Sequence, residues 1–171
     1  MSVIIDGSAS VTINSGAVLG ITSGTAVAST SGTSIDFTGL PAWVKRVTVM
    51  FNGVSTNGTS HMRVRIGSGS LQTTGYVSLA LVTNDSNTTG GITDTTGFIM
   101  FSNVAANTLI GQMVITNVSG NIWVESYQTR NSGTQIGGGG GNVTLTGALD
   151  RLSLVSTDTF DAGTINILYE G

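Results

Sequence analysis

The stretch from Thr33 to Val54 decides the fold, and it reads Thr-Ser-Ile-Asp-Phe-Thr-Gly-Leu-Pro-Ala-Trp-Val-Lys-Arg-Val-Thr-Val-Met-Phe-Asn-Gly-Val. In its first part Ile35 and Phe37 alternate with polar residues, which is the pattern of a half-buried β-strand. Pro41, the only proline of the chain, follows. Its ring fixes its own φ and favours an extended conformation in the residue before it, so it steers the chain from one strand into the next.

The second part of the stretch predicts another strand. Val47, Val49 and Phe51 share one face of it, and Arg46, Thr48 and Asn52 point the other way. Asn52-Gly53 is a turn signal that closes the run. Trp43 lies where the two strands meet, and we expect it to fill a core corner without taking part in chemistry.

The composition extends this β pattern to the whole chain. The 171 residues include 25 glycines and one proline, with many β-branched side chains and no helical apolar stripe of useful length. Later segments predict about nine or ten strands separated by turn signals, as in an all-β, antiparallel β-sandwich. A jelly roll suits this size, although strand spacing alone does not separate it from other sandwiches.

The charge content is unusually low. Only 9% of the residues are charged, where about 25% is typical, and the mean hydropathy is positive at +0.29. A surface of hydroxyl and amide groups lacks the repulsion that keeps copies apart, so we infer that sister copies cover part of it.

Several classes of function are disfavoured by the same composition. The net charge of −3 has the wrong sign for a nucleic-acid groove, and the absence of cysteine excludes disulfides and thiolate metal sites. No apolar run is long enough to cross a bilayer, and we expect no signal peptide.

The first 32 residues predict an extended arm and linker, and residues 33–171 predict the β-sandwich domain. Large apolar residues recur at odd positions of the arm, which gives it one apolar face for anchoring or oligomerisation. Fully extended, residues 1–27 would reach about 90 Å. The alternative is a pair of ordinary strands folded back on the domain. The candidate anchoring residues are Val3, Ile5, Val11, Ile13, Leu19 and Ile21.

Three later segments carry expectations that matter below. Val77, Leu79 and Leu81 share one face of a predicted strand. The run 98–102, which is apolar except for Ser102, predicts a central strand, and the segments 84–97 and 131–141 predict loops. The second loop ends in the five glycines 137–141, which are not a phosphate-binding loop because no Gly-Lys-Ser or Gly-Lys-Thr follows.

No residue set predicts an enzyme. His61 is the only histidine, and no Gly-x-Ser-x-Gly elbow accompanies it, so we expect an ordinary loop histidine. Oxygen ligands for calcium could come from Asn84, Asp85, Asn87 and Asp94, but their spacing does not match an EF-hand and lacks its closing glutamate. We expect no catalytic residue, no metal and no cofactor.

Trp123 and Tyr127 lie on the same face of a single predicted strand, with Glu125 between them on that face. Flat aromatic rings beside an acid are typical of glycan-binding faces, and subunit interfaces use the same residue types. Packing in the core is the alternative. The three residues are therefore candidates for interface or glycan contact.

Three runs carry a resemblance. They are MSVIIDG (1–7), GTSIDFTGLPAWVKRVTVMFNGVS (32–55) and DTFDAGTINILYEG (158–171). They resemble segments of tail-fibre-like and other structural proteins of tailed bacteriophages. The second and third runs bracket most of the chain. The resemblance implies a β-sandwich of jelly-roll type that usually forms homotrimers, with no catalytic residues.

On this basis we expect a tail-fibre-like structural protein of a bacteriophage virion, made in the cytoplasm of its bacterial host. Its arm would anchor it, and its sandwich would face outward for host attachment. Its partners would be its own copies in a homotrimer, other capsid or tail proteins and a host surface glycan, but neither nucleic acid nor membrane.

Two alternatives remain. The chain lacks the long shaft repeats of a typical fibre, which favours a capsid decoration protein that stabilises the shell. A stand-alone carbohydrate-binding module belongs to a different class, and a stable monomer with measurable sugar affinity would favour it.

Overall fold

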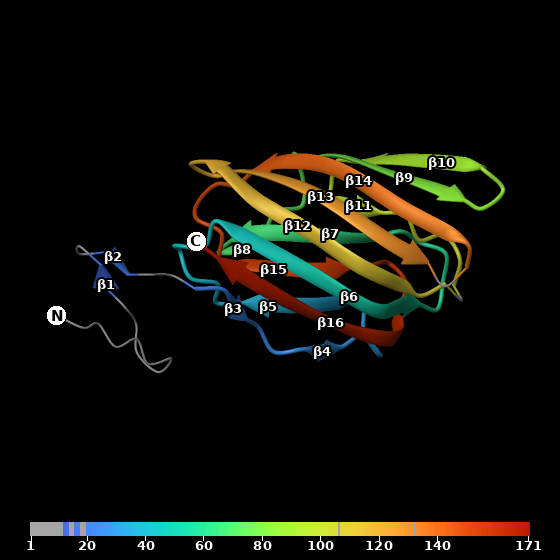
Figure 1. Cartoon of the computed structure of the whole chain (residues 1–171), viewed down its shortest axis with the longest axis horizontal. Coiled ribbons are helices and arrows are strands. Elements are labelled where there is room, and N and C mark those ends of the chain that lie inside the picture. Colours follow the sequence, from blue (N-terminus) through green and yellow to red (C-terminus); the bar gives the residue numbers. More distant parts are fainter. Residues whose placement is uncertain (1–11, 14–15, 18–19, 106, 132) are drawn as a thin grey trace.

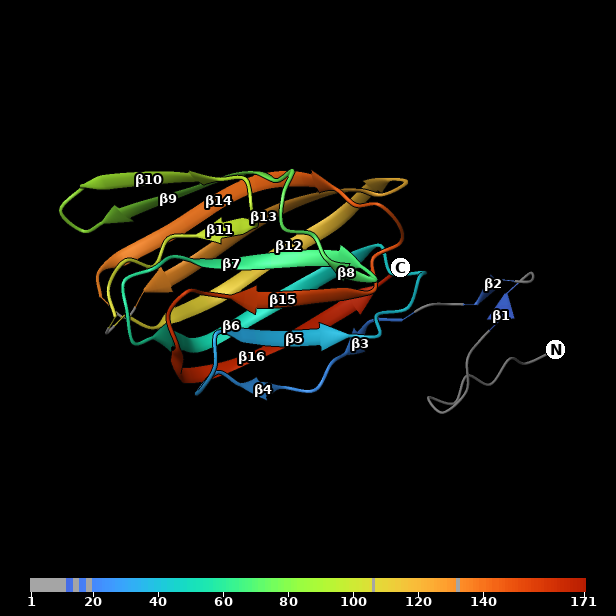
Figure 2. The same ribbon diagram turned by 180° about the vertical axis from the view of Figure 1, so that it is seen from behind.

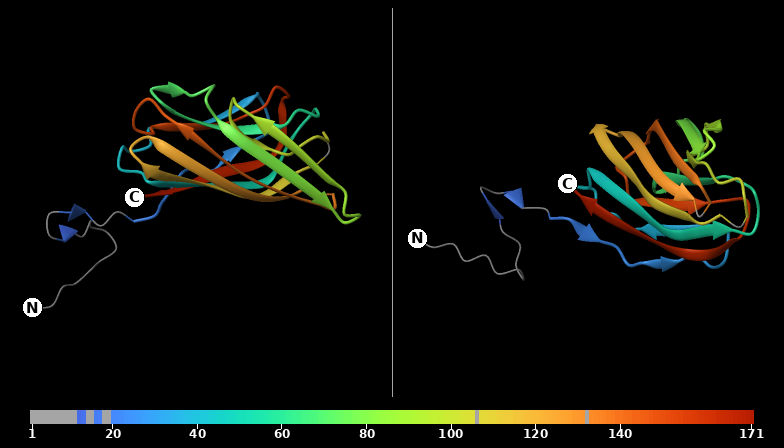
Figure 3. Two further views of the ribbon diagram at one scale, coloured as in Figure 1. Left: turned by 90° about the horizontal axis from the view of Figure 1, so that it is seen from above. Right: turned by 45° about the vertical axis from the view of Figure 1, so that its right-hand side comes forward.

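The structure is a computed structural model that describes residues 12–13, 16–17, 20–105, 107–131 and 133–171. The described chain forms an antiparallel β-sandwich of a large and a small sheet, with a separate pair of two-residue strands near the N-terminus. Figures 1 and 2 show the sandwich from its two sides, and Figure 3 shows the sheets as two layers. The strand order does not establish the jelly-roll connectivity, which stays a prediction.

The large sheet has nine strands. In spatial order they are β10 (Thr89–Asp94), β9 (Val77–Asn84), β14 (Gln135–Thr144), β13 (Ile122–Asn131), β12 (Leu109–Ser119), β6 (Arg46–Thr56), β16 (Phe160–Glu170) and β3 (Thr22–Ser23), and β4 (Val27–Ala28) also pairs with β16.

The small sheet has five strands, and the N-terminal pair forms a sheet of its own. The small sheet runs β11 (Phe98–Met100), β7 (Met62–Ser68), β15 (Arg151–Val155) and β5 (Ser34–Thr38), with β8 (Ser70–Leu71) on β7, and the N-terminal pair is β1 (Thr12–Ile13) and β2 (Gly16–Ala17).

The opening stretch joins the two layers. Its first strand is β5 of the small sheet and its second is β6 of the large sheet, so the turn around Pro41 crosses from one layer to the other. The predicted apolar faces of both strands are buried in the core. Trp43 is half-buried at the crossing, and its ring lies 5.8 Å from that of Tyr169, centroid to centroid. The strand–turn–strand prediction is confirmed.

The Asn52-Gly53 signal marks a bulge and not the end of a strand. β6 continues to Thr56, and its register with β16 shifts near this point. Gly53 has φ 70° and Gly163 on β16 has φ 96°, so both lie in the left-handed region that favours glycine. A Cβ on Gly163 would lie 2.4 Å from the carbonyl carbon of Gly53.

Part of the segment assigned to the arm belongs to the sandwich. β3 and β4 pair with β16 at the edge of the large sheet. Ser29 is fully buried, and its N–H donates to the Gly163 carbonyl at 2.9 Å. The folded-back alternative therefore describes residues 22–29. Among the candidate anchoring residues, Ile21 is 69% exposed. Ile13 lies in β1, where only the backbone is described. The other four, Val3, Ile5, Val11 and Leu19, lie outside the described residues.

The glycine run 137–141 is not a loop. It forms the middle of β14, which is hydrogen-bonded to β13 on one side and to β9 on the other. Glycine is needed because the inward positions have no room for a side chain. A Cβ on Gly139 would lie 2.3 Å from the Leu79 carbonyl oxygen and 2.5 Å from Cε1 of Tyr127.

Two other expectations are corrected. The run 98–102 was expected to be central, but β11 lies at the edge of the small sheet. It is nevertheless fully buried, because β9 and β14 of the large sheet pack against it. The expected loop 84–97 contains β10, which forms a hairpin with β9.

Candidate functional site

The outer face of the large sheet is the most unusual surface of the described chain. Its inner face packs on the small sheet, so alternate residues of each strand point outward. Here "outer face" means the outward residues of β9, β14, β13 and β12. They include exposed aliphatic residues on all four strands, namely Val77, Leu79 and Leu81 of β9, Ile136 of β14, Ile122 and Val124 of β13, and Ile110 of β12.

The strand β9 turns its larger aliphatic side chains to the outer face. Val77, Leu79 and Leu81 are 69%, 44% and 52% exposed. The opposite face of the strand carries Ser78 and Ala80, which are buried against the small sheet. The period-2 pattern was right, but the larger residues point away from the core. Val82 is also buried on this inward face. Ser78 packs over β11, where its hydroxyl accepts a hydrogen bond from the Ile99 N–H at 3.0 Å.

A groove runs along β14 in the middle of the outer face. Gly138 and Gly140 point outward and lie beside Leu81 and Leu79 of β9. On the other side they lie beside Gln128 and Ser126 of β13. Without side chains on β14, bare backbone forms the floor of the groove. We call these depressions along residues 137–141 the glycine groove.

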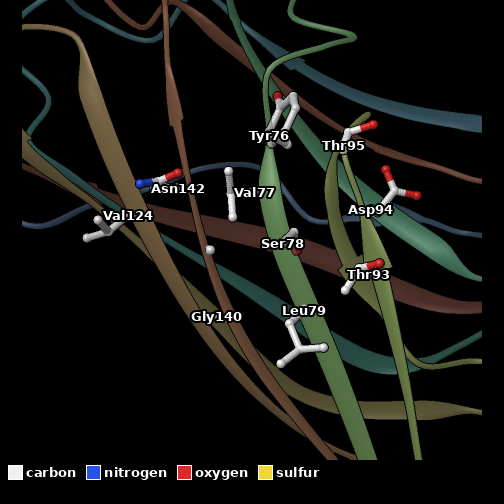
Figure 4. A pocket seen from close by; sticks show the side chains of 11 residues that line it. Tyr76, Val77, Ser78, Leu79, Thr93, Asp94, Thr95, Val124, Gly140 and Asn142 are labelled. Carbon is white, nitrogen blue, oxygen red and sulfur yellow. The ribbon is translucent and has the colours of Figure 1, made fainter.

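The glycine groove contains two shallow pockets, of about 420 and about 440 Å³. Figure 4 shows the first, with Val77 and Leu79 on β9 and Val124 on β13, on opposite sides of the β14 backbone at Gly140. The second lies between Leu81 and Gln128. The exposed walls are largely aliphatic, although Asp94, ion-paired with Arg63, also lines the first pocket, so the groove mainly suits an apolar partner surface.

Trp123, Glu125 and Tyr127 are not at the surface. Their relative exposures are 2%, 6% and 5%, and they face the interior between the sheets. The Tyr127 hydroxyl accepts a hydrogen bond from the Phe101 N–H at 3.2 Å. This burial agrees with the alternative expectation, packing in the core. The exposed residues of β13 alternate with these three and lie on the opposite face of the strand.

Glu125 is the most unusual buried group. Neither of its carboxyl oxygens has a hydrogen-bond partner in the described chain, and the same holds for Trp123 Nε1, Thr129 Oγ1 and Asn131 Oδ1. Burial without a partner disfavours the charged carboxylate, and it raises the pKa of Glu125 to about 8. The carboxyl group is therefore protonated in the folded protein at neutral pH.

His61 occupies a packing position beside the small sheet. Its Nδ1 accepts a hydrogen bond from the Ser102 N–H at 3.0 Å, and its ring lies 4.8 Å from that of Phe101. Partial burial, assisted by the nearby Arg63 charge, lowers the pKa of His61. A neutral imidazole that accepts a backbone hydrogen bond agrees with an ordinary structural histidine.

The oxygen groups considered for calcium lie at different ends of a hairpin. Asn84 and Asn87 shape the β9–β10 turn, where Asn84 Oδ1 accepts from the Thr88 N–H at 2.7 Å. Asp94 lies at the far end of β10 and accepts from Arg63 Nε at 2.6 Å. Burial alone would raise the pKa of Asp94, but hydrogen bonds from Thr96 and the Arg63 charge outweigh it and lower the pKa. Within the described residues, no three His, Cys, Asp or Glu side chains come together as a metal site would require.

The sequence reasoning missed the outer face, although the glycine run was a usable signal. Five consecutive glycines between aliphatic strands indicate either a loop or a strand whose neighbours approach closely.

The described part of the chain contains no helix that is long and apolar enough to span a membrane. No protein-family model matches the chain, and no curated protein and no solved structure compared with it matches either.

Proposed function

We propose that this chain is a structural subunit of a tailed-bacteriophage virion, tail-fibre-like, assembled as a homotrimer, anchored by its N-terminal segment and exposing its β-sandwich. The sequence resemblance supports this proposal, and the structure adds one observation about it. The resembling runs 32–55 and 158–171 are far apart in the chain but contain β6 and β16, which pair along most of their length in the large sheet. They form one structural unit, as expected if they derive from one domain.

The single observation that carries an assembly role is the outer face itself. Large aliphatic side chains are exposed on four adjacent strands, together with hydroxyl, amide and glycine positions. Contiguous apolar surface of this kind is typical of an interaction site. A subunit of a larger particle has a use for such a face, because its neighbours cover it.

The carbohydrate-binding alternative has less support. Sugar-binding faces use exposed aromatic rings on which the apolar side of a sugar packs. Both tryptophans, all three tyrosines and all five phenylalanines lie in the described part of the chain, and none of them is exposed. No exposed aromatic ring lies along the glycine groove, and among the aromatic residues Trp43, Phe101 and Tyr169 are half-buried and the others are buried.

Truncation tests the anchoring role. Deleting residues 1–19 should leave the sandwich folded, because β3, β4 and Ser29 remain paired with β16. We expect a thermal midpoint within a few degrees of the full-length value, together with loss of attachment to virions in co-sedimentation. Deleting residues 1–27 is the matched control, since it also removes β3 and the first residue of β4 and should lower the thermal midpoint further.

If the chain without residues 1–19 attaches to virions as well as the full-length chain does, the anchoring proposal is wrong. Low-resolution images of the labelled full-length protein on its particle would also separate tail from capsid. A position spread over the shell would support the capsid-decoration alternative.

A further inference from the structure

We propose that the outer face of the large sheet, centred on the glycine groove, is the surface through which copies of this chain pack against one another. The inference rests on the homotrimer in the proposed function and adds which surface the copies share. It is carried by the distribution of charge, by the size of the face and by the absence of features that other partners require.

Charged side chains are divided unequally between the two sides of the sandwich. On the strands β9, β14, β13 and β12, the only charged outward residue is Arg130. The next strands, β6 and β16, carry Arg46 and Glu170, which form an ion pair of 3.3 Å, and β16 also carries the exposed Asp161 near its start.

The small sheet is charged although its strands are short. The residues that point away from the core on its strands include Asp36 on β5, Arg63 and Arg65 on β7, and Arg151 on β15. Arg63 pairs with Asp94, and Arg151 pairs with Asp150. In a chain with so few charges, this distribution assigns the small sheet to solvent and the outer face of the large sheet to a contact. Interface cores are likewise depleted of charge.

The outer face has the right size for a stable contact. Strands lie about 4.8 Å apart, and outward residues on one strand are about 6.7 Å apart. Together with the flanking strands β10 and β6 the outer face spans six strands, and about four outward positions on each give roughly 770 Å². A stable interface buries about 800 Å² on each partner, so this wider face is of comparable size.

A second copy is the partner whose chemistry matches this face. An aliphatic and amide surface with one charged outward residue, Arg130, is complementary to another such surface. Nucleic acid or an acidic partner would need a basic patch, and Arg130 alone does not supply one. Leu79 and Leu81 beside Gly138 and Gly140 form a ridge and a furrow, a relief that a neighbouring copy's aliphatic side chains can enter.

The first test is a charge-introducing double variant of the full chain, Leu79→Lys with Leu81→Lys. Both positions are about half exposed, so the sandwich should keep its circular dichroism spectrum. In sedimentation velocity the wild type should behave as a species of three times 17.4 kDa, and the variant should shift to 17.4 kDa at the same concentration. The matched control is Ser34→Lys with Thr38→Lys on the small sheet, which should sediment like the wild type.

The second test avoids disturbing the interface and uses the absence of cysteine from the chain. Ser126→Cys places one thiol beside the glycine groove, and Thr38→Cys places one on the small sheet; both positions are exposed. We expect N-ethylmaleimide to modify the Ser126→Cys thiol at least tenfold more slowly than the Thr38→Cys thiol in the assembled protein. The two rates should become equal in denaturant.

The outcomes separate this inference from the proposed function. A wild type that is monomeric at high micromolar concentration overturns both the homotrimer and the shared surface. A trimeric wild type, with a lysine variant that stays trimeric or equal thiol rates in the assembled protein, overturns the surface alone. A lysine variant that unfolds leaves the decision to the thiol rates.

Discussion

Replacing Gly139 with alanine should destabilise the sandwich by about 3 kcal/mol, the upper end of what overpacking a folded interior costs. The added Cβ would lie 2.3 Å from the Leu79 carbonyl oxygen and 2.5 Å from Cε1 of Tyr127. The first of these atoms is backbone and belongs to the neighbouring strand, so β14 and β9 would have to separate. Urea denaturation at a concentration where the chain is monomeric measures the loss.

Gly140→Ala is the matched control for this prediction. Gly140 points outward, and its Cβ would meet only the Glu125 carbonyl oxygen at 3.5 Å, an ordinary contact. Since alanine loses less backbone entropy than glycine on folding, this variant should gain about 0.5 kcal/mol. Equal denaturation midpoints for the two variants would show that β14 is not a close-packed central strand.

Replacing Glu125 with glutamine should remove a pH dependence of stability from the wild type. In the unfolded chain this carboxyl group titrates near its ordinary value of 4.5, whereas burial raises its pKa in the folded protein to about 8. Below pH 4.5 both states are protonated, and the full stability is present. As the pH rises from 4.5 to about 8, the unfolded state releases the proton while the folded state keeps it, so the free energy of unfolding falls.

The difference between wild type and Glu125→Gln isolates this effect. His61, whose pKa is lowered, changes stability in the opposite direction at acidic pH but contributes equally to both proteins. We expect the variant to gain about 4 kcal/mol relative to the wild type between pH 4.5 and pH 8. Urea midpoints at closely spaced pH values would show it. Parallel profiles for wild type and Glu125→Gln would mean that the buried carboxyl group is not protonated.

The strands were largely predictable because most of them alternate cleanly. The stretch 33–54 predicted both β5 and β6 with the correct buried faces, since one face of each is wholly apolar and the other is mainly polar, with Met50 the exception on β6. The turn signals were less reliable. Asn52-Gly53 marks a bulge within β6, because Gly163 on the paired strand accommodates the distortion.

The candidate site was not predictable in the same way. On β13, Trp123 and Tyr127 alternate with Ile122 and Val124, so both faces of the strand are apolar. Local alternation separates two such faces but does not say which one packs on the other sheet. The expectation of exposed aromatic residues was therefore an even choice, and burial in the sandwich decided it.

By itself, the sequence determined that the chain forms antiparallel β-structure with very few charges, because composition and period-2 alternation are local properties. Only the tertiary structure decided which faces are covered. It placed the glycine run 137–141 between β9 and β13, and it turned Leu79 and Leu81 outward. The physical reason is that burial depends on which strands become neighbours, and residues far apart in the chain determine that pairing.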